Sequence, residues 1–515
     1  MSRFQGLALA LTTRALPASI AVTKYTPVGE REPALHVLGT GGPLGGEAIA
    51  MLSDTIVSSP RTFGLMVALM LWPLPAALSA QHAPGADHSS NMRLVAHVPL
   101  GVANSVADVE IEQDVNRPYV YVSRLEYREQ GEKGFDIVRL ADQDDSRVIY
   151  RWRIENQDLH EPTGGMDGKY FELDGRYYYV QSFQFGQGGP DHDLGAVVFD
   201  VTGLPDPTKI REVGRIRYPE IPGGFHNIFA YKHSSGRTLL FATVESPIDT
   251  AYGANIYDMA RFLAGDSASG LIGHVPLPGP RGAQRGYHDM YVAYLPASGQ
   301  DRFYGGGPEV TYLGGNYVYD VTDLEHPRLL ATVKAQEGQQ AGGHTFVATP
   351  DGRYVLTEMN SLAHAPIRIY DIGPALAGEQ PIVKMPVGAW TFDWTKSAHN
   401  IEMRWPYAFV SAYTGGLRVI DIRDPTEPVE VAFWDTYDRR TPYMGGSTAY
   451  GMFGVDVRNA DGLIVGSDMH SGLWAFRLEG FNGWNGHDWG VPDVSSVQDW
   501  TRSPGAAAND KEPRP

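Results

Sequence analysis

Four histidines stand in the same local context at nearly regular intervals along the chain. They are His226, His288, His344 and His399, which are 62, 56 and 55 residues apart. Each follows a loop rich in glycine or other small residues, and a large apolar residue stands two positions after each of them. Alternation of this kind is typical of a β-strand with one buried face. We therefore expect each histidine at the start of a strand.

Four imidazoles brought to one place would form a site for a transition metal. Imidazole is a ligand for Fe(II), Cu and Zn, whereas Mg²⁺ and Ca²⁺ prefer oxygen ligands. We expect one such ion here, with Fe(II) favoured over Cu or Zn. Carboxylates that accept the second ring N–H often orient metal-bound histidines, and the candidates are Asp167, Asp289 and Glu402. The alternative is that each histidine is an ordinary hydrogen-bonded core residue.

A repeated unit supplies the strands that would carry the histidines. Residues 197–207, 317–327 and 418–428 each hold a strand rich in β-branched and aromatic residues, then Asp and a turn with proline, and residues 367–372 hold a weaker copy. Such copies predict units of four antiparallel strands. The first strands start near residues 108, 167, 226, 288, 344, 399 and 454. This pattern predicts an all-β fold, a seven-bladed β-propeller over residues 92–480.

The two ends of the repeat predict how the ring closes. The last unit ends with a third strand at Leu473–Leu478, whereas an isolated strand at Leu94–Leu100 precedes the first unit. The isolated strand is similar to Leu271–Leu277, which is expected as the fourth strand of the third blade. We expect the N-terminal strand to complete the last blade, which would leave no unpaired sheet edge. Two separate β-sandwiches are the alternative.

A propeller would bring the four histidines together. The first strands of the blades line the central channel and start on one face, so the four imidazoles would point inward at one height. Loops between the second and third strands open on the same face, and their side chains could bind a substrate above the metal. The rim candidates for a catalytic role are His192, Tyr252, Tyr312, His364 and His470. Solvated rim residues without a role are the alternative.

The repeat also resembles that of a known family. The sequences Asp-Val-Thr-Asp and Asp-Ile-Arg-Asp, each followed by proline, recur in it, and residues 399–437 extend the likeness. On these residues the chain resembles the LVIVD-repeat, choice-of-anchor B group of secreted β-propellers, over residues 92–480. The resemblance implies the propeller architecture and carries no activity, cofactor or site residue. The sorting or anchoring segment of that family is not recognisable at residues 481–515.

The composition narrows the classes of function. A formal net charge of −18 is unsuited to general nucleic-acid binding, which needs basic surface. The chain has no cysteine, which excludes disulfides, thiolate metal sites, iron–sulfur clusters and cysteine nucleophiles. No nucleophile elbow, phosphate loop or dinucleotide fingerprint stands in a credible context. We expect a small-molecule substrate and no nucleic-acid partner.

The N-terminal region predicts export. Residues 63–80 contain an apolar run that follows Arg61 and ends in small residues, which indicates a secretory signal peptide cleaved near Ala80. The run is short for a membrane span and is interrupted by two prolines. We expect residues 1–80 to combine an over-extended gene start with this signal peptide, and Met51 would be a conventional start. An N-terminal anchor or a buried strand is the alternative.

Export defines the expected domain organisation. Residues 81–91 would be a linker, residues 92–480 the propeller, and residues 481–515 a polar C-terminal tail. The mature protein would be periplasmic or secreted, with no membrane contact after the signal peptide is removed. The sequence does not indicate an oligomeric state.

Two classes of function fit these features. The favoured one is a metal-dependent oxidoreductase of the oxygenase or oxidase type that acts on a small organic substrate. Four axial histidines on Fe(II) in a seven-bladed propeller are the arrangement of carotenoid-cleavage oxygenases, and selenium-binding propeller oxidases also use channel histidines, an analogy of site geometry alone. The alternative is a non-enzymatic recognition scaffold. A metal-dependent polysaccharide lyase is less favoured, because a polyanionic substrate needs a basic groove and the chain is acidic.

Overall fold

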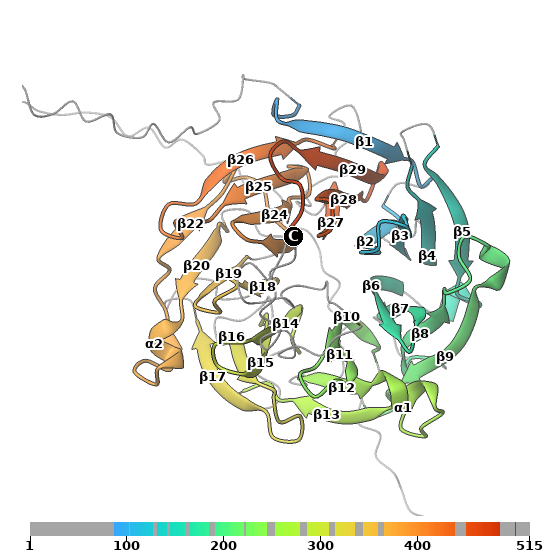
Figure 1. Ribbon diagram of the computed structural model, residues 1–515, viewed down its shortest axis with the longest axis horizontal. Coiled ribbons are helices and arrows are strands. Elements are labelled where there is room, and N and C mark those ends of the chain that lie inside the picture. Colours follow the sequence, from blue (N-terminus) through green and yellow to red (C-terminus); the bar gives the residue numbers. More distant parts are fainter. Residues whose placement is uncertain are drawn as a thin grey trace, which may run out of the picture. The chain divides into compact units, whose positions relative to one another are not determined.

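The computed structural model describes the chain from residue 87 onward, with gaps. The described residues are 87–101, 104–126, 131–141, 145–159, 164–184, 191–220, 223–244, 253–278, 286–307, 315–334, 343–358, 365–437, 450–484 and 500. They form an all-β, propeller-like structure of short sheets around a central axis (Figure 1). The expected signal peptide at 63–80 lies outside these residues. In the described part, no helix is long and apolar enough to cross a membrane.

Five of the six sheets in the described residues have four or five strands. The first contains β10 (Phe225–Lys232), β11 (Thr238–Val244), β12 (Ala254–Asp258) and β13 (Leu271–Val275). The second contains β14 (Met290–Leu295), β15 (Gln300–Gly305), β16 (Asn316–Asp320), β17 (Arg328–Val333) and β21 (Ile382–Val383). The third contains β18 (Phe346–Ala348), β19 (Tyr354–Thr357), β20 (Ile367–Asp371) and β22 (Gly388–Trp390). The fourth contains β23 (Ile401–Arg404), β24 (Tyr407–Ser411), β25 (Leu417–Asp421) and β26 (Val429–Trp434).

The fifth sheet joins the two ends of the described chain. It contains β27 (Met452–Arg458), β28 (Leu463–Asp468), β29 (Gly472–Leu478) and the N-terminal strand β1 (Met92–Val98). Leu94 of β1 lies opposite Phe476 of β29, and Val98 lies opposite Leu473. The predicted pairing between the N-terminal strand and the strand at 473–478 is therefore confirmed. This pairing covers an edge of β29 that would otherwise be free to pair with another chain.

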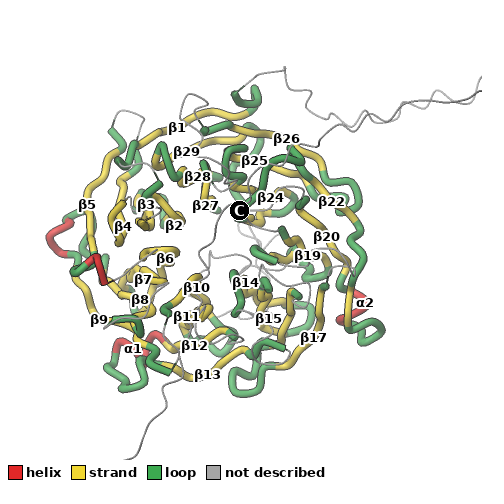
Figure 2. Tube along the Cα trace, turned by 180° about the vertical axis from the view of Figure 1, so that it is seen from behind, coloured by secondary structure: helices red, strands yellow, loops and turns green. Residues whose placement is uncertain are grey.

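The sixth sheet has eight strands, and the view from behind in Figure 2 shows them as two neighbouring groups. One half contains β2 (Val106–Ile111), β3 (Tyr119–Glu126), β4 (Gly131–Arg139) and β5 (Arg147–Arg153). The other half contains β6 (Gly164–Leu173), β7 (Arg176–Gln184), β8 (Leu194–Asp200) and β9 (Arg211–Arg217). The connections of the fold carry the short helices η1 (Gln157–Leu159), η2 (Pro207–Lys209), α1 (Met259–Leu263) and α2 (Gly373–Leu376).

The aspartate in each copy of the repeat forms the turn after the third strand of its unit. In Asp200, Asp320 and Asp421, Oδ1 accepts the backbone N–H of the residue two positions on, at 3.0, 3.1 and 2.9 Å. Asp371, in the weaker copy, does the same at 2.9 Å. A side-chain oxygen that bonds the backbone two residues on stabilises a tight turn. The repeat is therefore a buried strand followed by an aspartate-capped turn.

The fold begins earlier than expected. Residues 81–91 were expected to form a linker, but the chain from Asp87 runs beside β26. The backbone N–H of Asp435 donates to the Asp87 carbonyl at 2.8 Å, and the His88 ring stacks on Trp434 with ring centroids 4.3 Å apart. Backbone pairing and aromatic stacking thus extend the sheet region to residue 87.

The expected C-terminal tail also contributes to the core. Phe481 and Trp484 are 6% and 7% exposed and belong to the largest hydrophobic cluster. Trp500 is 7% exposed and packs against Phe171 with ring centroids 6.3 Å apart. Aromatic side chains of this size bury a large apolar area, which explains why these residues of a polar segment lie against the sheets.

We predict that β1 is needed to keep the last sheet from associating with other chains. Removing residues 1–98 deletes the buried side chains of Met92 and Val98, each worth about 1.5–3 kcal/mol of burial, and exposes the edge of β29. The variant should melt at lower temperature and aggregate in light scattering. Removing residues 1–86 alone is the control and should do neither. A soluble 1–98 deletion with an unchanged melting temperature would contradict the role of β1.

Candidate metal centre

Each of the four histidines stands at or just before the start of the first strand of its sheet, and Figure 1 shows β10, β14 and β18 on the inner side of their sheets. His226 is the second residue of β10, and His288, His344 and His399 come two residues before β14, β18 and β23. The backbone of these residues already bonds to the second strand, as in the His344 N–H that donates to the Glu358 carbonyl at 2.9 Å. The predicted location at strand starts is therefore confirmed.

The four imidazole rings lie side by side. The ring centroids are 4.0 Å apart between His226 and His288, 4.1 Å between His288 and His344, and 4.5 Å between His344 and His399. The exposed fractions of His288, His344 and His399 are 9%, 2% and 3%. Four residues that are far apart in sequence thus form one cluster, in which His226 is partly buried and the other three are buried.

A backbone irregularity at the start of β10 turns its histidine toward the axis. The register of β10 against β11 shifts between Phe225 and Ile228. The N–H of Asn227 donates to Thr243 Oγ1 at 2.9 Å instead of to a backbone carbonyl. An extra residue in one strand re-aims the side chains around it. As a result, His226 and Asn227, although adjacent in sequence, both line the cavity among the rings.

Two sheets without a histidine carry the same backbone bond. The N–H groups of Asp167 and Gly454 donate to a serine hydroxyl of the second strand at 3.0 and 2.9 Å. The residues that precede them, Met166 and Phe453, therefore occupy the histidine position. Both line the cavity among the four rings, whose volume is about 20 Å³, enough for one water molecule or one ion. The cluster thus has an imidazole side and an apolar side.

Three of the histidines bond an oxygen atom through Nδ1. Carboxylate, amide and backbone carbonyl oxygens only accept hydrogen bonds, so Nδ1 of each ring carries the proton and Nε2 keeps its lone pair. This is the tautomer of a histidine that binds a metal through Nε2. Nδ1 of His226 bonds Oε1 of Gln184 at 2.7 Å, and Nδ1 of His399 bonds the carbonyl oxygen of Phe453 at 2.5 Å. Nδ1 of His344 lies at ion-pair distance from Oε1 of Glu358, 2.9 Å away, and its hydrogen-bond partner is Oγ1 of Thr345 at 3.2 Å.

Burial keeps the imidazoles of His344 and His399 neutral. Burial lowers the pKa of His344 well below its ordinary value, and the neighbouring rings of His288, His399 and His226 lower it further. Burial likewise lowers the pKa of His399 to about 3, although its bond to the Phe453 carbonyl acts in the opposite direction. A neutral imidazole is the form that binds a metal.

The carboxylates predicted to orient the histidines bond other groups. Asp167 accepts from Lys169 Nζ at 2.9 Å, and Glu402 accepts from Arg404 at 2.7 Å. Asp289 accepts from Thr345 Oγ1 at 3.1 Å. The same hydroxyl lies 3.2 Å from Nδ1 of His344, so Asp289 reaches a histidine through one intervening side chain.

Sequence reasoning missed the residues that do bond the ring nitrogens. Gln184 ends β7, and Glu358 directly follows β19, so both stand at the end of a second strand. Glu358 lies opposite His344 because the two strands are antiparallel and their register places them there. In the sequence, these residues could have been found as polar residues at the end of the second strand of a unit, which pairs with the first strand.

The predicted substrate rim is only partly described. Tyr252, Tyr312 and His364 lie outside the described residues. His192 lies between β7 and β8, and His470 lies between β28 and β29, as expected for loops between second and third strands. The His470 ring stacks on Tyr450, with ring centroids 5.6 Å apart and an interplanar angle of 9°.

The four histidines are not arranged with their ring nitrogens directed at one common point, as the ligands of a metal ion would be. Within the described ranges, no group of three or more His, Cys, Asp or Glu side chains is placed to hold one metal ion. The rings pack on one another instead, with interplanar angles of 69°, 43° and 47° along the row. Binding an ion would require the rings to turn until their Nε2 atoms face one point.

Comparisons with known proteins leave the family open. No family model matches the chain, and no curated protein matches it. Among solved structures, Raptor of Chaetomium thermophilum is similar at 12% identity and a TM-score of 0.49, over 76% of this chain and 29% of Raptor. U3-55K is similar at 6% identity and a TM-score of 0.48, over 76% of this chain and 100% of U3-55K. Both TM-scores are below 0.5, so the propeller-like architecture rests on the sheets described above, and neither a family nor a function follows from these similarities.

We predict that Glu358 selects the tautomer of His344. In Glu358→Leu, the Nδ1–H of His344 loses the carboxylate, which should cost roughly 1–3 kcal/mol of unfolding free energy. Glu358→Gln keeps an acceptor and should cost less. Nitrogen NMR of labelled histidine should show the Nδ1–H form for His226, His344 and His399. The Nε2–H form at His344 in the wild-type protein would contradict this assignment.

Proposed function

We propose that the described sheets belong to a closed seven-bladed propeller. The eight-stranded sheet supports this count, because its two four-stranded halves are joined by the single pair Leu125 and Gly164. The innermost strands support closure, because each lies beside the next in the order β2, β6, β10, β14, β18, β23 and β27, and β27 lies beside β2. The likeness of the repeat to the LVIVD group of secreted propellers agrees with this architecture.

We propose that the four-histidine cluster binds one transition metal ion. The observation that carries this proposal is the row of four adjacent imidazoles, in which Nδ1 of three rings lies within 2.9 Å of an oxygen atom and burial lowers the pKa of His344 and His399. Four imidazoles at right angles around one ion would have neighbouring ring centres about 4.6 Å apart, for a metal–nitrogen distance of about 2.1 Å. The observed separations of 4.0–4.5 Å are close to that value. Fe(II) is the favoured ion, and Cu or Zn are the alternatives.

The function that this site supports best is that of an oxidoreductase of the oxygenase or oxidase type. A redox metal with four nitrogen ligands would supply open positions for O₂ or substrate. The protein's own part is to bury the site and to place Met166 and Phe453 in the same cavity, with the Phe453 ring 4.1 Å from that of His399. These apolar side chains limit water in the space next to the rings. We propose a small organic substrate, bound at the rim of the same face.

Two other functions remain as outcomes of the test. A non-enzymatic recognition scaffold would keep the buried histidines as core residues or as a structural metal site. A polysaccharide lyase is less favoured, because the channel next to the cluster is lined by Asp108, Glu110 and Asp456 and would repel a polyanionic substrate. We further propose that the chain is exported to the periplasm or the medium, on the pattern at residues 63–80.

Metal analysis tests the proposed function. Protein expressed without a polyhistidine tag should contain about one equivalent of iron, copper or zinc. His344→Ala should lower the metal content at least about tenfold, since loss of even an outer-sphere partner costs about 10–100-fold in affinity. The variant should stay folded, because strand pairing rather than the metal holds the sheets. The matched control is His326→Ala, which removes a histidine whose side chain is 78% exposed.

The same samples separate the classes of function. Bound iron or copper, together with O₂ uptake when candidate organic substrates are added, supports the oxidoreductase. Bound zinc without O₂ uptake supports a structural or hydrolytic role. Metal-free protein that does not take up Fe(II), Cu or Zn would contradict the metal site and leave the scaffold. Equal metal content in His344→Ala and His326→Ala would show that the metal is bound elsewhere.

A further inference from the structure

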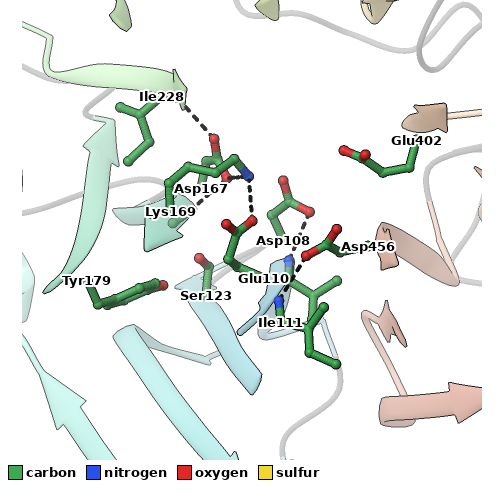
Figure 3. Close-up of polar contacts among 12 residues, drawn as sticks. Asp108, Glu110, Ile111, Ser123, Asp167, Lys169, Tyr179, Ile228, Glu402 and Asp456 are labelled. Atoms are coloured by element: carbon green, nitrogen blue, oxygen red, sulfur yellow. Dashed lines mark hydrogen bonds and ion pairs between the residues drawn. The ribbon is translucent and has the colours of Figure 1, made fainter. Parts of the chain in front are cut away.

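A second cavity lies directly beside the histidine cavity on the central axis. Its volume is about 40 Å³. Asp108, Asn227 and Asn400 line both cavities, so the two adjoin. The acidic side chains of this second cavity come from several innermost strands and surround Lys169 of β6 (Figure 3). We call it the acidic compartment.

The acidic compartment holds more carboxyl groups than cations. Two cations bond into it. Lys169 Nζ lies 2.9 Å from Asp167 Oδ1 and 3.4 Å from Glu110 Oε2. Arg404 lies 2.7 Å from Glu402 Oε2 and 3.5 Å from Asp456 Oδ1. The carboxyl groups that line it are those of Asp108, Glu110, Asp289, Glu402 and Asp456. A sixth, that of Asp167, lines the histidine cavity and shares Lys169 with Glu110.

Burial makes this excess of acids costly if all are ionised. The exposed fractions of Asp108, Glu110 and Asp456 are 8%, 2% and 2%. A buried carboxylate without a cation of its own costs several kcal/mol, and it takes up a proton instead. Six carboxyl groups and two cations leave an excess of four acids, so protons are the available counter-charge.

Glu110 is the clearest case of a buried carboxyl group that has no cation of its own. Among the described residues, its Oε2 atom accepts no hydrogen bond, and the cation nearest to it, Lys169, is shared with Asp167. Burial raises the pKa of Glu110 well above its ordinary value, and Lys169 only partly offsets this. The carboxylates of Asp456, Asp167 and Glu402 also face Glu110 and raise its pKa further.

The pKa values of Asp456 and Lys169 are both raised, which favours the protonated carboxyl group of Asp456 and the charged amine of Lys169. Burial raises the pKa of Asp456 to about 7, and nearby Glu402 raises it as well, while Arg404 and Lys169 lower it. Burial alone would lower the pKa of Lys169, but Asp167 and Glu110 raise it well above its ordinary value. Lys169 therefore stays charged, while the acids around it share a limited number of protons.

We propose that the acidic compartment is a proton store for the histidine cavity, in which Glu110 and Asp456 hold protons at neutral pH and the chain Glu110–Lys169–Asp167 connects them to the histidines. This proposal deepens the proposed function, because it supplies protons to, or accepts them from, a reaction at the metal. Glu110 lines the acidic compartment and Asp167 lines the histidine cavity. Lys169 Nζ forms ion pairs with both carboxyl groups. A proton would move between the cavities when Lys169 gives one proton to Asp167 and takes the proton of Glu110, which leaves Lys169 charged as before.

Infrared spectroscopy tests whether the acidic compartment holds protons when no metal ion is bound. The full chain, treated with a chelator at pH 7, should show the C=O band of protonated carboxyl groups, identified by its shift in D₂O. Glu110→Gln should lower the band by the share of one carboxyl group, and Asp456→Asn should lower it by about half that share, because the pKa of Asp456 is about 7. Glu110→Gln replaces a neutral group by a neutral group and should leave the melting temperature unchanged. Glu212→Gln, at an exposed ion pair with Arg215, is the control and should leave the band unchanged.

Two results would overturn the store. One is the absence of a protonated-carboxyl band in the wild-type protein at pH 7, and the other is an unchanged band in both Glu110→Gln and Asp456→Asn. Calcium provides a further check, because these oxygen ligands could hold Ca²⁺ instead. Loss of the band on stoichiometric Ca²⁺ binding at millimolar or lower concentration would make the compartment a cation site.

Zinc binding tests the connection to the histidine cavity. Zn²⁺ is a redox-inert probe of the four histidines, and neutral imidazoles release no proton when they bind it. Calorimetry in two buffers should therefore detect protons released from the acidic compartment on Zn²⁺ binding, and fewer in Glu110→Gln. Stoichiometric Zn²⁺ binding without proton release would overturn the connection. Absence of Zn²⁺ binding would overturn the proposed metal site instead, and the infrared result would still decide the store.

Discussion

The candidate site depends on one backbone feature, the irregular start of the innermost strands. At this point a backbone N–H leaves the strand ladder and donates to a hydroxyl of the second strand, as Asn227 does to Thr243 and Asn400 to Ser411. A bulged strand re-aims its side chains. It therefore turns two successive residues toward the axis, where a regular strand would offer only one. The histidines and the polar layer beside them both follow from this arrangement.

The same geometry explains the chemistry of the cluster. Because the rings are buried side by side, each charged imidazole would be destabilised by desolvation and by its neighbours. Because Nδ1 of three rings bonds an oxygen atom, the remaining lone pairs belong to Nε2. The acids concentrate on the other side of the same residues, around Lys169. Neutral nitrogen ligands and buried acids thus lie in adjoining cavities along one axis.

Much of the architecture could be predicted from the sequence, because the repeat has a strong period. The expected strand starts near 226 and 454 correspond to β10 at Phe225 and β27 at Met452, and the likeness of Leu94–Leu100 to another outer strand predicted the pairing of β1. The four histidines could be found because each occupies the same position in its unit. The strand starts and the histidine positions follow from residue spacing, so they can be recognised without knowing which residues are in contact.

The remaining parts of the site depend on strand register and could not be predicted. Glu358 stands opposite His344 only because of how β19 pairs, and Phe453 contributes a backbone oxygen that carries no sequence signal. Lys169 and Asp167 form an ion pair because they stand two residues apart in β6, which places both side chains on the same face of the strand. The roles of Asp87 and Trp500 in the fold were missed for a related reason, since both lie outside the repeat.

Anomalous X-ray diffraction from crystals of the full chain tests the central claim most directly. Data collected on either side of the iron, copper and zinc absorption edges would locate and identify a bound ion. The account predicts one peak with Nε2 atoms of His226, His288, His344 and His399 about 2.0–2.2 Å away. A well-ordered structure of metal-supplemented protein, with the four rings packed on one another and no anomalous peak among them, would contradict it.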